Sequence, residues 1–99
     1  MEELIYFNEL YDLYGNLLTD KQKQYFEDYY FNNLSLGEMA ENYVISRNAI
    51  FKQIHIVTDK LKMYEEKLGF NHKLNKLFEV VESLEEDVKE KIEDIFKEY

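Results

Sequence analysis

The fold is decided by the stretch Ser35-Leu-Gly-Glu-Met-Ala-Glu-Asn-Tyr-Val-Ile-Ser-Arg-Asn-Ala-Ile-Phe-Lys-Gln-Ile54, which predicts two helices joined by a tight turn. Glu38 follows Ser35 by three residues, the capping-box spacing in which each side chain bonds the backbone N–H of the other residue. Ser46 is suited to cap a second helix that begins at Arg47. This arrangement is typical of a helix-turn-helix, whose second helix lies in a nucleic-acid groove.

The two faces of the second helix differ in chemistry. The apolar side chains of the stretch recur at helical spacing, and we expect them to face inward: Leu36, Met39, Ala40, Tyr43, Ile45, Ala49, Ile50 and Ile54. The residues left outward are of the types that contact phosphates and base edges. We therefore predict a nucleic-acid-binding recognition surface made of Ser46, Arg47, Asn48, Phe51, Lys52 and Gln53.

Two positions in this stretch leave alternatives open. Phe51 is either outward, where its ring is able to stack on an unpaired base, or inward as part of the core, which its apolar character favours. Val44 holds the turn position that usually takes glycine, because the backbone there tends to a positive φ. A β-branched residue resists that conformation at a cost of about 1–2 kcal/mol. We therefore expect a reshaped or longer turn, in which Val44 has a negative φ.

Composition limits the class of protein. The 99 residues suffice for one small domain with a single core, and three glycines with no proline favour nearly continuous helix. The chain has no cysteine, so it offers no disulfide, thiol nucleophile or zinc–thiolate site. No apolar run is long enough to span a bilayer. We expect a cytoplasmic binding module with no membrane partner.

The charge is unevenly distributed along the chain. The formal net charge of −9 opposes a polyanion at long range. Residues 1–34 carry seven acids and two lysines, a balance of −5, and residues 63–99 carry eleven acids and six lysines, again −5. Residues 35–62 balance at +1, with three acids against four basic residues. The one segment that is not acidic is therefore the predicted helix-turn-helix.

Helix signals also divide the amino-terminal third of the chain. Residues 2–14 repeat apolar positions at helical spacing up to Gly15, which is suited to a left-handed cap. Thr19 and Gln22 form a second capping-box pattern, and the helix that they begin is expected to run to about Asn32. Two helices are therefore expected before the central stretch.

The second helix of the motif is predicted to be long. Apolar residues continue at spacings of three and four from Arg47 to Leu68, and Gly69 then supplies a helix end. His72, which follows shortly after, is expected to lie in a turn.

The carboxy-terminal segment carries weaker signals. Asn71 is suited to cap a further helix, and Ser83 with Glu86 repeats the capping-box spacing, although one helix over residues 71–99 is an alternative. An apolar stripe runs through Leu77, Val81, Leu84, Val88, Ile92, Ile95 and Tyr99. The stripe is expected to fold back on the amino-terminal helices, and the alternatives are a homodimer contact or a docking helix for a partner.

Several of these elements together resemble one bacterial family. They are Tyr14-Gly15-Asn16-Leu17-Leu18-Thr19-Asp20-Lys21-Gln22-Lys23, Tyr29-Tyr30, Leu34 to Glu41, and Ser46-Arg47-Asn48-Ala49-Ile50. Their order and spacing over residues 1–70 are similar to the YlxM-type (p13-like, UPF0122) proteins, whose helix-turn-helix is similar to region four of sigma factors. Genes of that family typically neighbour those of the signal recognition particle GTPase and its receptor. The resemblance therefore implies a regulatory or accessory role in protein targeting.

We therefore expect an all-α helical bundle that contains a sigma region four-like helix-turn-helix. Residues 1–70 form the helix-turn-helix domain, and residues 71–99 form an acidic amphipathic extension of one or two helices. The first functional hypothesis is a regulator that binds DNA or signal recognition particle RNA. The second is a protein adaptor that docks on the targeting GTPase and uses the helix-turn-helix as scaffold only. The sequence contains no nucleophile with an orienting base, no glycine-rich phosphate loop and no metal-ligand spacing, so neither catalysis nor a cofactor is expected.

Overall fold

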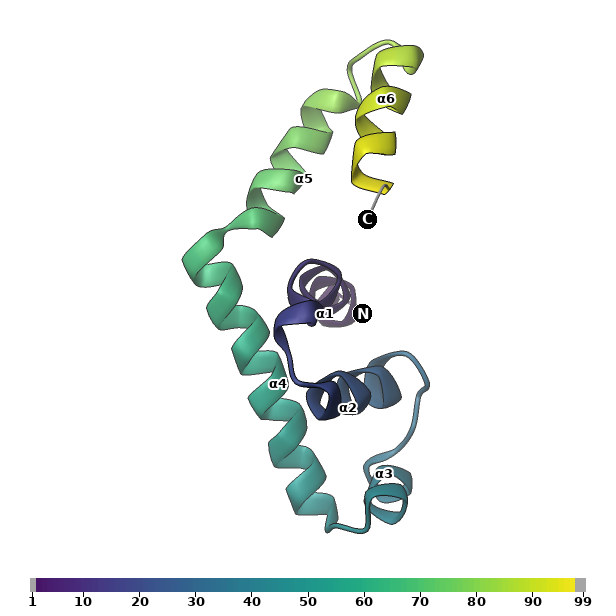
Figure 1. Ribbon diagram of the computed structural model, residues 1–99, viewed down its shortest axis with the longest axis vertical. Helices are drawn as coiled ribbons and strands as arrows, with labels where there is room; N and C mark the ends of the chain where they lie inside the picture. Colours follow the sequence, from purple (N-terminus) through teal and green to yellow (C-terminus); the bar gives the residue numbers. More distant parts are fainter. Residues whose placement is uncertain (1, 98–99) are drawn as a thin grey trace. The chain divides into compact units, whose positions relative to one another are not determined.

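The computed structural model describes residues 2–97, and these residues are helical with no strand among them. The elements are α1 (Glu2–Tyr14), the 3-10 helix η1 (Gly15–Leu17), α2 (Asp20–Tyr30), α3 (Leu36–Tyr43), α4 (Arg47–Leu68), α5 (Phe70–Val81) and α6 (Glu86–Lys97), shown in Figure 1. The all-α fold predicted from the sequence is confirmed. The chain forms two compact units, the first ending at Gly69 and the second beginning at Phe70.

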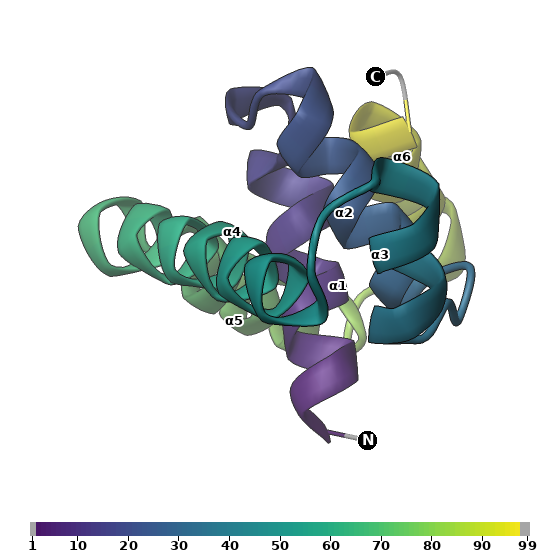
Figure 2. The same cartoon turned by 90° about the horizontal axis from the view of Figure 1, so that it is seen from below.

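The long helix α4 organises the first unit. Helices α1, α2 and α3 all pack against it, as Figures 1 and 2 show from two directions. Its buried side chains recur at helical spacing and are Ile50, Ile54, Val57, Thr58 and Leu61. Because α4 packs against all three other α-helices of this unit, contacts along its whole length hold its amino-terminal turns in place.

Two adjacent clusters of side chains make up that core. The larger contains Phe7, Leu10, Tyr14, Leu18, Phe26, Val57 and Leu61. The smaller lies under the helix-turn-helix and contains Tyr25, Met39, Ile50 and Ile54. Aromatic rings cross between helices in the larger cluster, where the Phe26 ring stacks on Tyr11 at a centroid distance of 4.3 Å. Most tyrosines of the first unit therefore act in core and rim packing.

Both predicted capping boxes of the first unit are present. At the start of α2, Thr19 Oγ1 accepts from the Gln22 backbone N–H at 3.2 Å, and the Thr19 N–H donates to Gln22 Oε1 at 3.0 Å. At the start of α3, Ser35 and Glu38 make the same reciprocal pair at 3.1 and 3.0 Å. Bonds from the Ser35 backbone and side chain lower the pKa of the Glu38 carboxyl. Each box satisfies two helix-end N–H groups that otherwise lack partners.

Gly15 does not form the left-handed cap expected from the sequence. It begins η1, and Gly69 is the one glycine of the described chain with a positive φ, 67°. A Cβ atom at Gly15 would lie 3.1 Å from the Tyr11 ring. The glycine therefore serves the close approach of that ring to the backbone, and the helix ends by tightening into a 3-10 turn.

The turn of the helix-turn-helix also differs from expectation. Val44 has a φ of 56° and a ψ of 46°, so the turn keeps the left-handed conformation and is not reshaped. The Val44 and Ile45 N–H groups both donate to the Ala40 carbonyl, the latter at 3.1 Å. These bonds close α3, and they outweigh the local cost of a β-branched residue. Ile45, expected to face inward, is exposed beside it.

Replacing Val44 with asparagine is expected to raise the free energy of unfolding by about 1 kcal/mol, because asparagine tolerates the left-handed region. The Val44 side chain is 87% exposed, so no packing is lost. Chemical denaturation measures the change. The control is Glu41→Asn at an exposed position within α3, where the same new residue should lower stability by a few tenths of a kcal/mol. An unchanged or lower stability of Val44→Asn would contradict the strain at this turn.

Two tyrosines donate hydrogen bonds to carboxylates of α2. The Tyr11 hydroxyl of α1 bonds Glu27 Oε2, and the Tyr43 hydroxyl of α3 bonds Asp28 Oδ2. Burial, followed by the bond to Asp28, raises the pKa of Tyr43 to about 12. The pKa of Tyr11 is raised in the same direction by burial and by Glu27. Both bonds require the neutral phenol.

We therefore expect stability to fall on the alkaline side. An unfolded tyrosine has a pKa of about 10, so the unfolded state loses its proton first. The contribution of Tyr43 is fully present below pH 10 and is lost as the pH rises through about 12. Thermal melts between about pH 8 and 12 measure the fall. The variant Tyr43→Phe should show a shallower fall, and an equal slope would contradict this origin.

The second unit contains α5 and α6. The helix α5 begins at Phe70, so Asn71 lies inside its first turn, is buried and is not the expected cap. His72, expected in a turn, lies in the same helix. The sequence signal failed because the left-handed Gly69 ends α4 and leads directly into the next helix.

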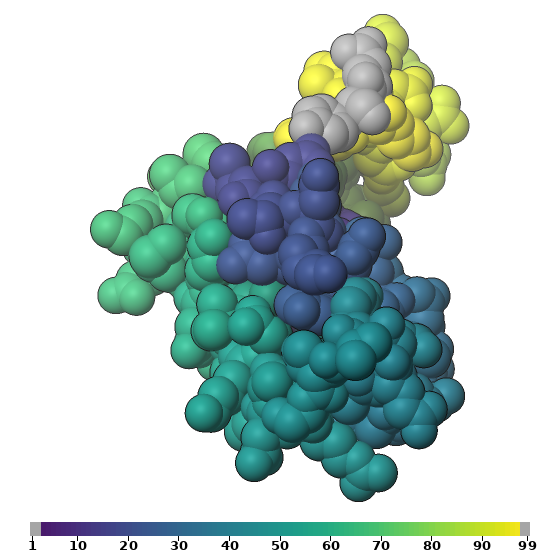
Figure 3. Space-filling model, turned by 60° about the horizontal axis from the view of Figure 1, so that its bottom comes forward, coloured from purple at the N-terminus to yellow at the C-terminus, as the bar shows by residue number. Residues whose placement is uncertain are grey.

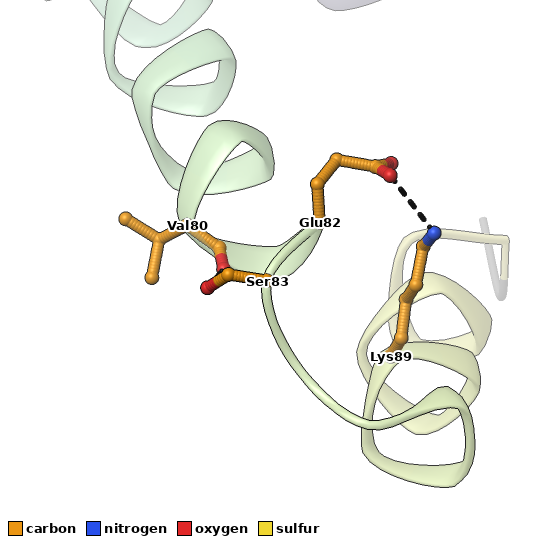
Figure 4. Close-up of polar contacts among 4 residues, drawn as sticks. All are labelled: Val80, Glu82, Ser83 and Lys89. Atoms are coloured by element: carbon orange, nitrogen blue, oxygen red, sulfur yellow. Dashed lines mark hydrogen bonds and ion pairs between the residues drawn. The ribbon is translucent and has the colours of Figure 1, made fainter.

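The connection between α5 and α6 settles the alternative of one helix or two. Two helices form, and Ser83 lies in the turn between them and not at a helix cap (Figure 4). The Ser83 hydroxyl donates to the Val80 carbonyl at 2.7 Å, so it closes α5 and the expected capping box with Glu86 is absent. Lys89 bonds Glu82 across the turn at 2.9 Å. The Phe78 and Phe96 rings also meet, at a centroid distance of 5.4 Å.

Candidate nucleic-acid interface

The predicted recognition surface lies on the first turns of α4. Ser46 precedes that helix in an extended conformation, and its Oγ accepts from the Ala49 backbone N–H at 3.1 Å, as predicted. Helix α3 packs across this end of α4 over the smaller core cluster. The chain therefore has the helix-turn-helix arrangement in which the second helix is presented at an outer edge.

Five of the six residues predicted for the recognition surface are exposed. They are Ser46, Arg47, Asn48, Phe51 and Lys52. The sixth, Gln53, is half-buried on the flank of α4 that faces away from the others. The atoms of α3 and of the first turns of α4 adjoin in the teal part of the surface in Figure 3. Two cationic side chains, an amide and an aromatic ring are therefore exposed at one end of α4.

Arg47 is held against the other helix of the motif. A Cβ atom at Gly37 would lie 3.0 Å from Arg47 Nη2 and 3.2 Å from its Nε, so the guanidinium lies close above the backbone of this glycine. Arg47 is the single arginine of the chain. A larger residue at position 37 would shift the flexible end of the Arg47 side chain, at small cost to the stability of the fold. The Arg47 guanidinium therefore lies over Gly37, a contact between α3 and α4 that the sequence alone did not reveal.

Phe51 is not the core residue that we favoured from the sequence. Its side chain is 51% exposed, and its ring lies against the His55 ring at a centroid distance of 4.4 Å. His55 Nδ1 bonds the Phe51 carbonyl at 3.1 Å, which fixes the imidazole on the same face of α4. The prediction failed because Phe51 lies at the edge of the apolar stripe of α4, where burial depends on what the neighbouring helices cover.

A groove that the sequence did not predict lies beside Phe51. It has a volume of about 380 Å³, and residues of α1, α2, α3 and α4 line it. His55, Asp59 and Lys62 continue along α4 from Phe51 and contribute polar groups. Their spacing of four, four and three residues is the only sequence signal for this row, and any surface helix offers the same pattern.

Residues 2–97 lack two other features that would indicate a function. No helix in that range combines the length and the apolar character that crossing a membrane requires. Histidine and carboxylate side chains in the same range do not gather in a group of three or more able to hold a metal ion.

The fold and the exposed start of α4 define a helix-turn-helix protein. A model of the UPF0122 family, described as "Putative helix-turn-helix protein, YlxM / p13 like", matches residues 1–98. The chain belongs to this family, which confirms the resemblance seen in the sequence.

Relatives in several bacteria agree with that assignment. A UPF0122 protein of Caldanaerobacter subterraneus is 41% identical over 86% of this chain and 73% of its own length. The UPF0122 protein of Geobacillus kaustophilus is 41% identical over 87% of this chain and 78% of its own. That of Listeria innocua is 42% identical over 89% of both chains. The similarity therefore extends well beyond the helix-turn-helix.

Proposed function

We propose that this protein binds nucleic acid through the recognition surface at the start of α4 and acts as a regulatory or accessory protein of the signal recognition particle pathway. Membership of a helix-turn-helix family supports the binding of nucleic acid in general. The observation that carries the proposed site is the exposed cluster of Arg47, Asn48, Phe51 and Lys52 beyond the Ser46 cap. The pathway rests on the gene neighbourhood that the family resemblance implies. The proposed location is the cytoplasm.

The side chains of this cluster are able to contact both the phosphates and the base edges of a nucleic acid. Arg47 and Lys52 supply the positive charge for phosphates, and Asn48 is able to bond an adenine edge with two hydrogen bonds. Charges elsewhere oppose the association, because Glu38 and Glu41 are exposed on the neighbouring helix α3. We therefore infer modest affinity with a small number of phosphate contacts.

A binding titration against two ligands tests the proposal. The full chain is titrated into a promoter DNA duplex and into signal recognition particle RNA, each at several salt concentrations. Phosphate contacts release counterions, so the affinity should fall as salt rises, with a logarithmic slope of about −2 for two contacts. The ligand that binds with the higher affinity and the steeper salt dependence is then identified as the target, DNA or RNA. Binding of neither ligand at low salt would reject the proposal.

The charge of the second unit favours an alternative function. Helix α6 carries five acids against three lysines and exposes Val88, Ile95 and Phe96. In this alternative the helix-turn-helix is scaffold, and the extension 71–99 docks on a basic surface of the signal recognition particle GTPase.

Replacing Glu90 and Asp94 of α6 with lysine in the full chain should abolish capture of that GTPase if the alternative holds. The variant Arg47→Glu should leave capture unchanged. Sedimentation of the wild type distinguishes a homodimer from a monomer. Unchanged capture by the Glu90→Lys/Asp94→Lys variant would contradict the docking of α6 on the GTPase.

A further inference from the structure

The groove beside Phe51 has features that duplex binding does not require. Its lining includes Phe51, His55 and Lys62 from α4, Tyr29 from α2, and the carboxylates of Glu3 and Asp59. Its volume of about 380 Å³ admits a single planar heterocycle together with its sugar. All of these residues belong to the first unit.

Aromatic rings form the wall of the groove nearest to the recognition surface. The rings of Phe51 and His55 are tilted with an interplanar angle of 44°, and Phe51 is 51% exposed. Tyr29 is also exposed and meets Tyr30 nearly at right angles, at 5.1 Å. Exposed rings on a concave surface favour a flat ligand, because stacking removes from water the face of the ring and the face of the ligand that meet.

The charged groups of the groove select what kind of ligand enters. The carboxylates of Glu3 and Asp59 repel a phosphate and accept hydrogen bonds from an amino group. The Lys62 ammonium, which also lines the groove, lies 5.3 Å from the centroid of the Phe7 ring. This distribution suits a base that donates from its edge to a carboxylate of the groove, with the Lys62 ammonium available to its phosphate.

The groove is continuous with the recognition surface along α4. Phe51 lies one turn after Arg47 and next to Lys52, so it belongs to both surfaces. From Phe51 to Lys62 the helix rises about 16 Å, the length of a few nucleotides. A strand whose phosphates contact Arg47 and Lys52 is therefore able to deliver an adjacent base to the groove.

We propose that the groove binds one unpaired base with an exocyclic amino group, cytosine in preference to uracil, from a bulge or loop of a structured RNA. This inference rests on the proposed function, and it assigns a ligand class to the flank of the same site. The Phe51 ring stacks on the base, and the Asp59 carboxylate accepts from its amino group. Unpaired bases are the usual means by which proteins read RNA sequence, and aromatic stacking is their usual contact.

Three matched RNA hairpins test the proposal with the full chain: one fully paired, one with a single bulged cytosine and one with a single bulged uracil. Affinity should be highest for the cytosine bulge. A fluorescent base analogue placed at the bulge should be quenched on binding. The variant Phe51→Ala should weaken binding of the cytosine bulge by about 5- to 100-fold, the range that one stacked base contributes. Its affinity for the paired hairpin should fall by a smaller factor, so that the preference of the protein for the bulged hairpin is lost.

Two further variants isolate the parts of the site. Ile56→Ala is the matched control, because Ile56 is 46% exposed on α4 and does not line the groove, and its binding should equal that of the wild type. Asp59→Asn should narrow the preference for cytosine over uracil, because the amide offers a donor as well as an acceptor.

The possible results distinguish a failure of the base-binding groove from a failure of the proposed nucleic-acid function. Equal wild-type affinity for the paired and bulged hairpins overturns the base-binding groove and leaves the proposed function standing. An equal fold-loss of affinity for all three hairpins in Phe51→Ala also overturns it, since that residue would then contribute only to the surface that binds the duplex. Absence of salt-dependent binding by the wild type to any nucleic acid overturns both.

Discussion

Replacing Phe26 with alanine is expected to lower the free energy of unfolding by about 3–5 kcal/mol, the usual cost of removing a fully buried aromatic ring. Phe26 is 0% exposed and belongs to the larger core cluster. Its ring stacks on Tyr11 at 4.3 Å and on Tyr30 at 4.5 Å, and it meets Phe31 edge-on at 5.7 Å. A domain of this size is stabilised by only about 5–15 kcal/mol, so the variant loses much of its margin.

The matched control is Phe31→Ala, because Phe31 is the same residue type, five residues further along the chain, and 46% exposed. It should lose less than about 2 kcal/mol, since a smaller area returns to water. Urea denaturation followed by circular dichroism measures both variants. Similar losses for Phe26→Ala and Phe31→Ala would contradict the position of Phe26 at the centre of the aromatic cluster.

Local signals in the sequence predicted the parts of the fold that local bonds determine. The capping boxes at Thr19 and Ser35 and the cap at Ser46 are present as expected, because each depends on three or four consecutive residues. The same spacing at Ser83 gave no capping box, because the serine hydroxyl bonds the last turn of the preceding helix. Capping patterns therefore locate a helix boundary without telling which helix the side chain serves.

The parts that depend on packing between helices were not predictable in this way. The exposure of Phe51 is decided by how far α1 and α2 extend over α4, and no spacing within α4 records that extent. The approach of Arg47 to Gly37 joins two helices across the turn. Val44 shows the same effect on the backbone, since bonds to Ala40 hold a conformation that valine by itself disfavours.

The six residues proposed for nucleic-acid recognition stay a prediction, and their charge gives the sharpest test. Reversing both cations in Arg47→Glu/Lys52→Glu is expected to reduce nucleic-acid affinity by more than about 100-fold at low salt. Two phosphate contacts are lost and two repulsive charges replace them. The salt dependence of the remaining affinity should also decrease by about two contacts. Both side chains are exposed, so the fold should be unaffected.

A charge-matched variant separates local contacts from overall repulsion. Lys67→Glu/Lys97→Glu changes the net charge by the same amount at exposed positions in the last turns of α4 and α6. Lys67 lies about 30 Å along the helix from Arg47, several times the screening length of about 8 Å at physiological salt. The control should therefore keep most of its affinity. If both double variants weaken binding equally, net charge and not the start of α4 governs the association, and the helix-turn-helix is then better understood as scaffold.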